Sequence, residues 1–403
     1  MAGVSGEDVF EVPAAWSRHV VPRRGAPGPA LTVAPAVDTD LAGELDRTVA
    51  RLPAVLGHPE TPAPIAAAGL EFVARPAAAS PLGAAVAVAA LPRRTARAPQ
   101  AAFDSLVDVW VSGAGVRHTA RVVAEVAGLY AGSGRTGATD LVTWAAPDSP
   151  RQAFLRDIWT RLALRLRAHL AAADADEHAA VVADLAALRD DPRPLRRVTA
   201  SLLAPTVTTW VDKDCATFAD ATDETFCRLL LPAAGTRGQL DVLLRVVAPH
   251  WLFWDEPTIL TLAAAIGPDL EPVLLHLLRT EALSADPVAW TAGILAAFPT
   301  DTAFDALAER SGWRPVQPAL AAAIRRFPDR AVRRLAEGPA HPTVDVLLAA
   351  HVRADPARAT RLLPDLGEPA AARVRALLHV DAGPVAAPGA VPAVLATPPW
   401  TVR

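Results

Sequence analysis

The chain has 403 residues, of which 52% are hydrophobic, and a formal net charge of −4. This length suffices for two or three cooperative units or for one elongated repeat array. The net negative charge argues against a nucleic-acid partner, because such proteins carry a clustered, strongly basic surface.

Localisation is suggested by what the sequence contains at its start and in its cysteine spacing. The first residues carry acidic side chains and no apolar run of the secretory kind. Cys215 and Cys227 have the spacing neither of a metal motif nor of a disulfide framework. Every long apolar run is interrupted by proline or charge. We therefore expect a cytoplasmic protein with no membrane partner.

Residues 1–100 are predicted to form an irregular and partly helical N-terminal region rich in alanine and proline. Within it the run AAVAVAAL, residues 84–91, fits either a helix or a buried strand. Periodicity does not separate these two alternatives over so short a stretch.

Residues 101–200 are predicted to be helical. The clearest segment is 151–170, whose apolar side chains recur at helical spacing and form one stripe. The stripe consists of Phe154, Leu155, Ile158, Trp159, Leu162, Leu166 and Leu170. Its arginines lie mostly beside or opposite the stripe, and Asp157 stands four residues before Arg161 as a favourable helical pair. These features predict a surface helix that packs on one side.

A formal GxGxxG motif is made by Gly132, Gly134 and Gly137. A dinucleotide site requires a strand before this motif and a helix after it. The apolar pattern before it has helical spacing and ends at Tyr130. We therefore interpret the motif as a flexible connection between helices, and we expect no cofactor.

The stretch 209–227 gathers several acidic residues and both cysteines. It has no EF-hand spacing, no cysteine pair and no nearby histidine. An acidic turn between helices is the favoured interpretation over a metal site, with both cysteines as small buried side chains.

An aromatic cluster surrounds His250 in the sequence APHWLFWDEP. It fits the core or cap of a helical array better than a ligand pocket, which is the other interpretation. Signature motifs of zinc proteases and of hydrolase nucleophile elbows are missing from the sequence. We expect no catalytic residues and no enzyme activity.

Residues 201–380 are predicted to form HEAT-like helical repeats, and residues 381–403 a Pro-rich C-terminal tail. Two interleaved series of prolines recur at spacings of 27 to 31 residues and open candidate helices. They are Pro257, Pro287, Pro315 and Pro342, with Pro268, Pro299, Pro328 and Pro356. Paired helices at a fixed period are typical of an α-solenoid, so the predicted fold class is all-α and HEAT-like.

One eight-residue frame occurs twice within these repeats, at 328–335 and at 356–363. Helical geometry places Ala331, Leu335, Ala359 and Leu363 inward, and the arginines of the frame on the opposite, solvated side. Stacking of successive units would then align four arginines along one surface. This candidate partner-binding set is Arg330, Arg333, Arg358 and Arg361.

Charge is distributed unevenly over the predicted repeats. Residues 325–375 contain ten arginines and six acids, whereas residues 255–310 contain two arginines and nine acids. The late repeats could orient an acidic protein or peptide, or could pair with another part of the same assembly. A third interpretation, an array that binds nucleic acid, is supported by these arginines alone.

Three stretches together resemble a known family. They are EDVFEVPAAWSRHVVPRRG near the start, SLLAPTVTTWVDKDC in the middle, and the AAFP, RRFP and HVRADP helix pairs that close with VPAVLATPPW. In combination they resemble the N-terminal helical region of the WGR-associated, molybdate metabolism regulator-like family of uncharacterised bacterial proteins. The resemblance implies packing motifs and no catalytic residue.

This sequence has no Trp-Gly-Arg tripeptide and stops just after Trp400, where family members generally continue into a long C-terminal domain. We expect a non-catalytic α-solenoid scaffold that binds a protein or peptide. The alternative is the recognition arm of a regulatory protein or enzyme whose active C-terminal domain is missing or encoded separately.

Overall fold

The computed structural model describes residues 6–26, 28–133, 139–146, 153–279, 285–339 and 341–379. The chain divides into two compact units. Unit 1 contains Met1–Phe10 and Ser284–Arg403, and unit 2 contains Glu11–Leu283. This division differs from the predicted boundaries at 100 and 200, and the predicted tail 381–403 lies outside the described residues.

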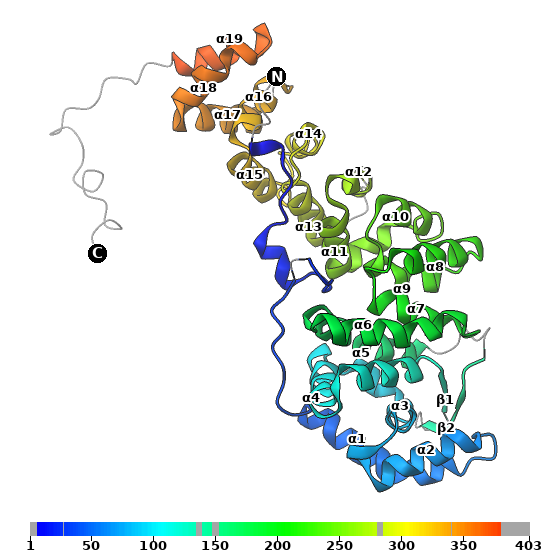
Figure 1. The fold of residues 1–403 in the computed structure, drawn as a ribbon. Coiled ribbons are helices and arrows are strands. Elements are labelled where there is room, and N and C mark those ends of the chain that lie inside the picture. Colours follow the sequence, from blue (N-terminus) through cyan, green and yellow to red (C-terminus); the bar gives the residue numbers. More distant parts are fainter. Residues whose placement is uncertain are drawn as a thin grey trace, which may run out of the picture. The chain divides into compact units, whose positions relative to one another are not determined.

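Unit 2 is built of helices and one β-hairpin, as Figure 1 shows. Its α-helices and strands are α1 (Thr39–Leu56), α2 (Ala63–Ala74), α3 (Pro81–Ala89), α4 (Gln100–Val126), β1 (Leu129–Ser133), β2 (Thr139–Trp144), α5 (Ala153–Ala172), α6 (Ala175–Ala186), α7 (Pro194–Leu203), α8 (Thr208–Asp220), α9 (Glu224–Leu230), α10 (Arg237–Leu243), α11 (Glu256–Ile266) and α12 (Glu271–Arg279). Shorter 3-10 turns lie between them: η2 (Ala14–Arg18), η3 (Pro76–Ala78), η4 (Arg93–Arg97), η5 (Ala187–Asp190), η6 (Leu231–Ala233), η7 (Pro249–Trp254) and η8 (Gly267–Leu270).

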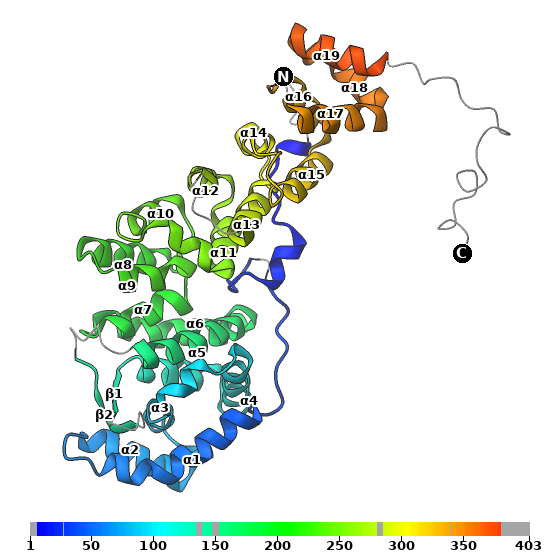
Figure 2. The same ribbon diagram turned by 180° about the vertical axis from the view of Figure 1, so that it is seen from behind.

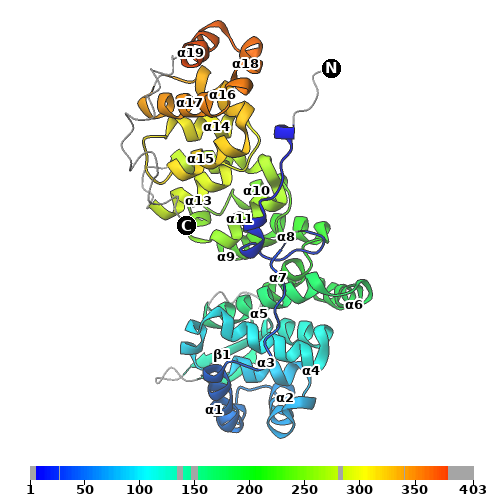
Figure 3. The same ribbon diagram turned by 90° about the vertical axis from the view of Figure 1, so that its left-hand side faces the viewer.

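The all-α prediction is confirmed, and the ambiguous run 84–91 is resolved in favour of a helix. Ser80 caps α3 by accepting a hydrogen bond from the Gly83 N–H at 3.2 Å. Every residue of α3 from Gly83 to Ala89 is buried. The helix packs against α2, α4 and the hairpin (Figure 3). Because neighbours surround α3, its sequence needs no polar face and shows no amphipathic period.

Residues 129–144 correct one prediction. The apolar pattern expected to continue as helix through Tyr130 instead ends with α4 at Val126, and β1 begins at Leu129. β1 pairs antiparallel with β2, Leu129 opposite Trp144, and the pair lies against α3 (Figure 2). Gly132 is therefore in a strand of a hairpin, whereas Gly134 and Gly137 lie outside the described residues. A second strand stands where a dinucleotide motif needs a helix.

The apolar stripe of α5 is confirmed for Leu155, Ile158, Trp159, Leu162, Leu166 and Leu170, which are all buried. The expected Asp157–Arg161 pair is absent from the ion pairs of the described residues. Arg167 was expected outside the stripe and is instead fully buried. It donates hydrogen bonds to the carbonyls of Pro22 at 2.5 Å and Pro232 at 2.8 Å, which explains why a guanidinium lies in the interior.

The segment between η2 and α1 contacts several helices of unit 2. Val21 donates its N–H to the Thr261 hydroxyl at 2.7 Å. Further along, the Ala34 N–H donates to Asp108 at 2.7 Å. Asp108 is buried in α4 and also binds Arg165 and His169 of α5, each at 2.7 Å. The lead into α1 is thus fixed by buried polar groups and not only by apolar contact.

The acidic stretch 209–227 is mostly helix and only briefly a turn. Asp214 lies within α8, is buried, and accepts hydrogen bonds from Arg189 at 2.6 Å and from Ser201 at 2.7 Å. The turn is confined to the residues between Asp220 and Glu224. Both cysteines are free and buried, as predicted.

One stretch, Glu256–Arg279, is long and apolar enough to cross a membrane by length and composition. It consists of α11, η8 and α12, and 61% of its apolar 18-residue window is buried inside the structure. Gly267, at φ 68°, ends α11 and separates it from the helical residues that follow. Buried core helices satisfy the same criterion.

Unit 1 contains seven α-helices within its described residues. They are α13 (Ala285–Leu295), α14 (Asp301–Glu309), α15 (Gln317–Arg326), α16 (Pro328–Glu337), α17 (Pro342–Ala354), α18 (Pro356–Leu362) and α19 (Glu368–Leu378), with η1 (Gly6–Asp8) and η9 (Leu363–Asp365). Consecutive helices pack together, and α13 also contacts α15, α14 contacts α16, and α16 contacts α18. Contacts between helices two apart in the chain thus accompany the contacts between consecutive helices in this part of unit 1.

The proline series correctly predicts several helix starts. Pro328, Pro342 and Pro356 are the first residues of α16, α17 and α18. Pro315 was expected to open a helix but precedes α15, whose first turn holds Pro318 instead. The inward positions of the repeated frame are confirmed for Ala331, Leu335 and Ala359, which are fully buried, whereas Leu363 is half-buried in η9.

Candidate partner-binding site

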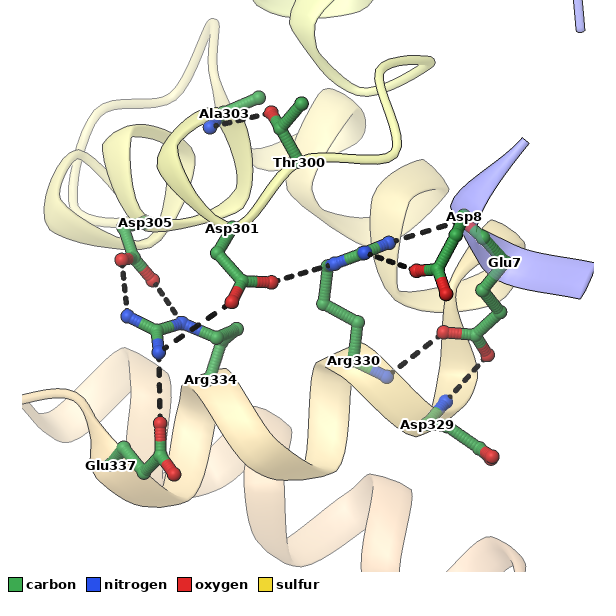
Figure 4. Close-up of polar contacts among 10 residues, drawn as sticks. All are labelled: Glu7, Asp8, Thr300, Asp301, Ala303, Asp305, Asp329, Arg330, Arg334 and Glu337. Carbon is green, nitrogen blue, oxygen red and sulfur yellow. Dashed lines mark hydrogen bonds and ion pairs between the residues drawn. The ribbon is translucent and has the colours of Figure 1, made fainter. Parts of the chain in front are cut away.

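The N-terminal arm, residues 6–10, lies across the beginning of α16 in unit 1. Glu7 accepts hydrogen bonds from the Asp329 N–H at 2.7 Å and from the Arg330 N–H at 3.0 Å, one with each carboxylate oxygen. Proline opens α16, so the first free N–H groups of the helix are those of these two residues. Glu7 therefore caps a helix more than 300 residues away in the sequence, as Figure 4 shows.

Arg330 holds the same arm from the side of the helix. Its Nη1 donates to the Glu7 carbonyl at 3.2 Å and its Nη2 pairs with Asp8 at 3.0 Å. On the other side its Nε pairs with Asp301, the first residue of α14, at 2.8 Å. The guanidinium thus lies between two carboxylates (Figure 4), and only 6% of the side chain is exposed. The five donors of a guanidinium suit this simultaneous contact with several acceptors.

Arg334, one helical turn later, extends the contact between α14 and α16. Its Nε and Nη2 both bind Asp305, the former at 2.9 Å, and its Nη1 reaches Glu337 at 2.8 Å. The hydrogen bonds to Asp305 raise the pKa of Arg334, although burial opposes the rise. This pairing keeps α16 in a fixed register against α14.

An aromatic contact completes the attachment of the arm. The rings of Phe10 and Phe298 are 5.3 Å apart and nearly perpendicular. Phe298 is buried, whereas Val9 between the acids and Phe10 is 55% exposed. Edge-to-face pairs of this kind add stability beyond the apolar area that they bury. The arm is thus bound by two acidic residues and one aromatic ring.

The four arginines predicted as a partner-binding set do not share one solvated face. Arg330 is buried against the arm, which contradicts the expectation that it is on the solvent side. Arg358 and Arg361 both approach Asp329, at 3.1 Å and 3.3 Å. Arg333 is half-buried and enters no ion pair within the described part of the chain. A role of these arginines in binding a partner stays a prediction.

Glu7, Asp8 and Asp301 are the site residues that the sequence pattern did not single out. Helical periodicity reports which face of α16 is apolar, but it contains no information on a segment that lies over the other face. The uneven distribution of charge over the predicted repeats was the one sequence signal that pointed to ion pairs at this site. Pairing within the assembly, one of its two interpretations, is what Asp301 and Arg330 do.

The described residues hold no group of three or more His, Cys, Asp or Glu side chains placed to bind a metal ion. The residues around Arg330 are ion pairs and a helix cap, and none is a nucleophile beside a general base. The chemistry of the site is recognition of carboxylates on an extended chain segment.

Fold and site define an all-α protein of packed helices, one face of which holds an acidic segment of its own chain. The model of a protein family described as the YehI second domain matches residues 39–251, just over half of the chain. The chain therefore belongs to this family. No curated protein matches the chain, and no solved structure matches it. Membership of the WGR-associated family stays a prediction.

Proposed function

We propose that this protein is a non-catalytic, HEAT-like solenoid scaffold whose α14–α16 face binds an acidic segment of a partner protein. The observation that supports this function is the binding of the N-terminal arm through Glu7 and Asp8. In the proposed mechanism a partner segment with two consecutive acids and a following aromatic residue replaces the arm. Arg330 and the N–H groups of α16 then bind the partner's carboxylates.

Competition by the arm sets the affinity that a partner must have. A segment attached to its own site acts at a high effective concentration, in the millimolar range for short flexible connections. The arm contacts the site with few residues, and Asp8 and Val9 are exposed. Such a contact opens at a smaller free energy than the helical core, because it buries little apolar surface.

The test uses the full chain with Glu7→Gln and Asp8→Asn, which weaken the arm without shortening it. A fluorescent peptide of residues 5–12, SGEDVFEV, is titrated with this protein and with the wild type, and anisotropy is recorded. We expect tighter binding to the variant. Adding Arg330→Gln to the variant should abolish binding, whereas Arg333→Gln on the same helix should leave it unchanged.

The peptide control replaces the two acids by their amides, giving SGQNVFEV. Failure of SGEDVFEV to bind the variant at millimolar concentration, or equal binding of both peptides, contradicts the proposal. Thermal unfolding of each variant, followed by circular dichroism, separates loss of the site from loss of the fold.

A further inference from the structure

Unit 2 contains a cleft that is separate from the arm site. Its volume is about 550 Å³, within the range usual for small-molecule sites. The walls come from the first residue of α4, from α5, α7 and α9, from the turns η6 and η7, and from the start of α11. Val21, from the extended lead into α1, also lines it.

Three guanidinium groups line the cleft, those of Arg156, Arg161 and Arg228. None of them forms an ion pair within the part of the chain that the structure describes. Arg161 lies over the ring of Phe103, with 5.5 Å from its guanidinium carbon to the ring centroid. Arg165 of the same helix, by contrast, is bound to the carboxylate of Asp108. The cleft therefore presents positive charge that the fold itself does not neutralise.

Two acids also line the cleft, and neither neutralises these arginines. Asp255 caps α11, accepting from the N–H and the hydroxyl of Thr258 at 3.2 Å and 2.7 Å. Asp157 is exposed and enters no ion pair among the described residues. An incoming anion would thus meet three cations and two acids, one of them already engaged as a cap.

The uncharged lining includes both polar residues, such as Thr160 and Thr225, and apolar ones. Leu202, Leu231 and Leu252 line the cleft and are buried. Beside them the indole of Trp251 is covered by the guanidinium of Arg228, whose carbon lies 3.9 Å from the ring centroid. A guanidinium stacked on an aromatic ring keeps its edge free to bind a carboxylate or phosphate with two hydrogen bonds.

We infer that this cleft binds a small organic anion, with a phosphate or carboxylate group on the arginines and an apolar or aromatic body on the leucines and Trp251. The interpretation of the aromatic stretch around His250 as a ligand pocket thereby regains support through Trp251, although Leu252 is in the core. The inference does not depend on the arm site, since it uses none of its residues.

Isothermal titration of the full chain with phenyl phosphate tests the inference. Two further probes are phenol, which lacks the anionic group, and inorganic phosphate, which lacks the apolar body. Both should bind at least tenfold more weakly than phenyl phosphate. Arg228→Gln and Arg161→Gln should each weaken phenyl phosphate binding about tenfold, because each removes a charge-assisted hydrogen bond. Arg51→Gln, an exposed arginine of α1 away from the cleft, should have no effect.

The absence of any heat of binding at millimolar phenyl phosphate would overturn the inference. Equal binding to all three variants overturns it as well, because the anion would then be bound elsewhere. Inorganic phosphate binding as tightly as phenyl phosphate contradicts the apolar part of the site. Binding of the SGEDVFEV peptide, measured with these substitutions added to the Glu7→Gln, Asp8→Asn protein, should be unchanged, so the two proposals fail independently.

Discussion

Asp301 and Arg330 are 29 residues apart in the sequence and 2.8 Å apart in the structure, where they join α14 to α16. The same relationship, an acid followed about one repeat later by its arginine, joins Asp305 to Arg334 and Asp345 to Arg373. The period predicted from the sequence is therefore also a spacing of ion pairs. These pairs balance three acids and three arginines of unit 1.

Arg330 and Arg361 both belong to the repeated frame, at different positions in it, and their side chains differ in burial. Arg330→Ala removes a buried group with several partners and should cost about 3 kcal/mol of unfolding free energy. Arg361→Ala removes a side chain that is 64% exposed and should change it by less than about 0.5 kcal/mol. Urea denaturation followed by circular dichroism measures both. Equal effects would show that burial does not distinguish the two.

Asp108 should make the stability of unit 2 depend on pH. Burial raises the pKa of this carboxyl, but hydrogen bonds from Arg165, the Ala34 N–H and His169 together lower it below its usual range. The stabilisation is thus present above the unfolded pKa, about 3.9, and is lost as pH falls through the folded value.

Asp108→Asn should therefore destabilise by about 2 kcal/mol at pH 7, the value of hydrogen bonds to a charged group. The difference from the wild type should shrink as the pH is lowered toward 3. Asp157→Asn, at an exposed position on α5, is the control and should have no effect at any pH. A difference that grows toward acid pH would contradict the assignment. Thermal unfolding across this pH range records the result.

Cys215 and Cys227 should be unreactive in the folded protein. Burial, with smaller effects of nearby acids, raises the pKa of Cys215 to about 12 and that of Cys227 to about 11. The thiolate is the reactive form, so little of either thiol reacts at pH 8. Ellman's reagent should detect no rapid thiol in the native protein and two after addition of guanidinium chloride. One fast thiol in the native state would disprove this.

Gly83 permits the close approach of α3 and α2. A Cβ atom at this position would lie 2.6 Å from the backbone carbonyl oxygen of Ala68. Gly83→Ala should therefore cost about 1 to 3 kcal/mol, since a backbone atom cannot move aside cheaply. At Gly113 of α4 the same atom would meet nothing within 4 Å, and Gly113→Ala should stabilise by about 0.5 to 1 kcal/mol. Melting temperatures that shift in the same direction would contradict the packing of α3.

Local sequence patterns correctly predicted features that depend on residues close together in the chain. The helical period identified the buried stripe of α5 and the inward Ala331 and Leu335, and proline marked three helix starts. The helical period did not identify α3, because a helix buried on all sides has no polar face. The hairpin at Leu129 was also missed, since its short strand continues the apolar residues of α4.

The candidate site was predicted only in part. Arg330 was singled out, but its periodicity placed it toward solvent, because the pattern cannot include a segment more than 300 residues away. Glu7 and Asp8 carry no helical or strand signal of their own. In the cleft, the elements that bring Arg161 and Arg228 together are likewise far apart in the sequence, so only the folded chain reveals their proximity.

The attachment of the arm to α16 also affects the order in which the chain is completed on the ribosome. Glu7 is synthesised 322 residues before its partner Asp329. At about 5 to 20 residues per second this interval lasts roughly 16 to 64 s. During that time the helices of unit 2 can form while the arm has no binding site. The arm is thus synthesised long before it can reach its final place.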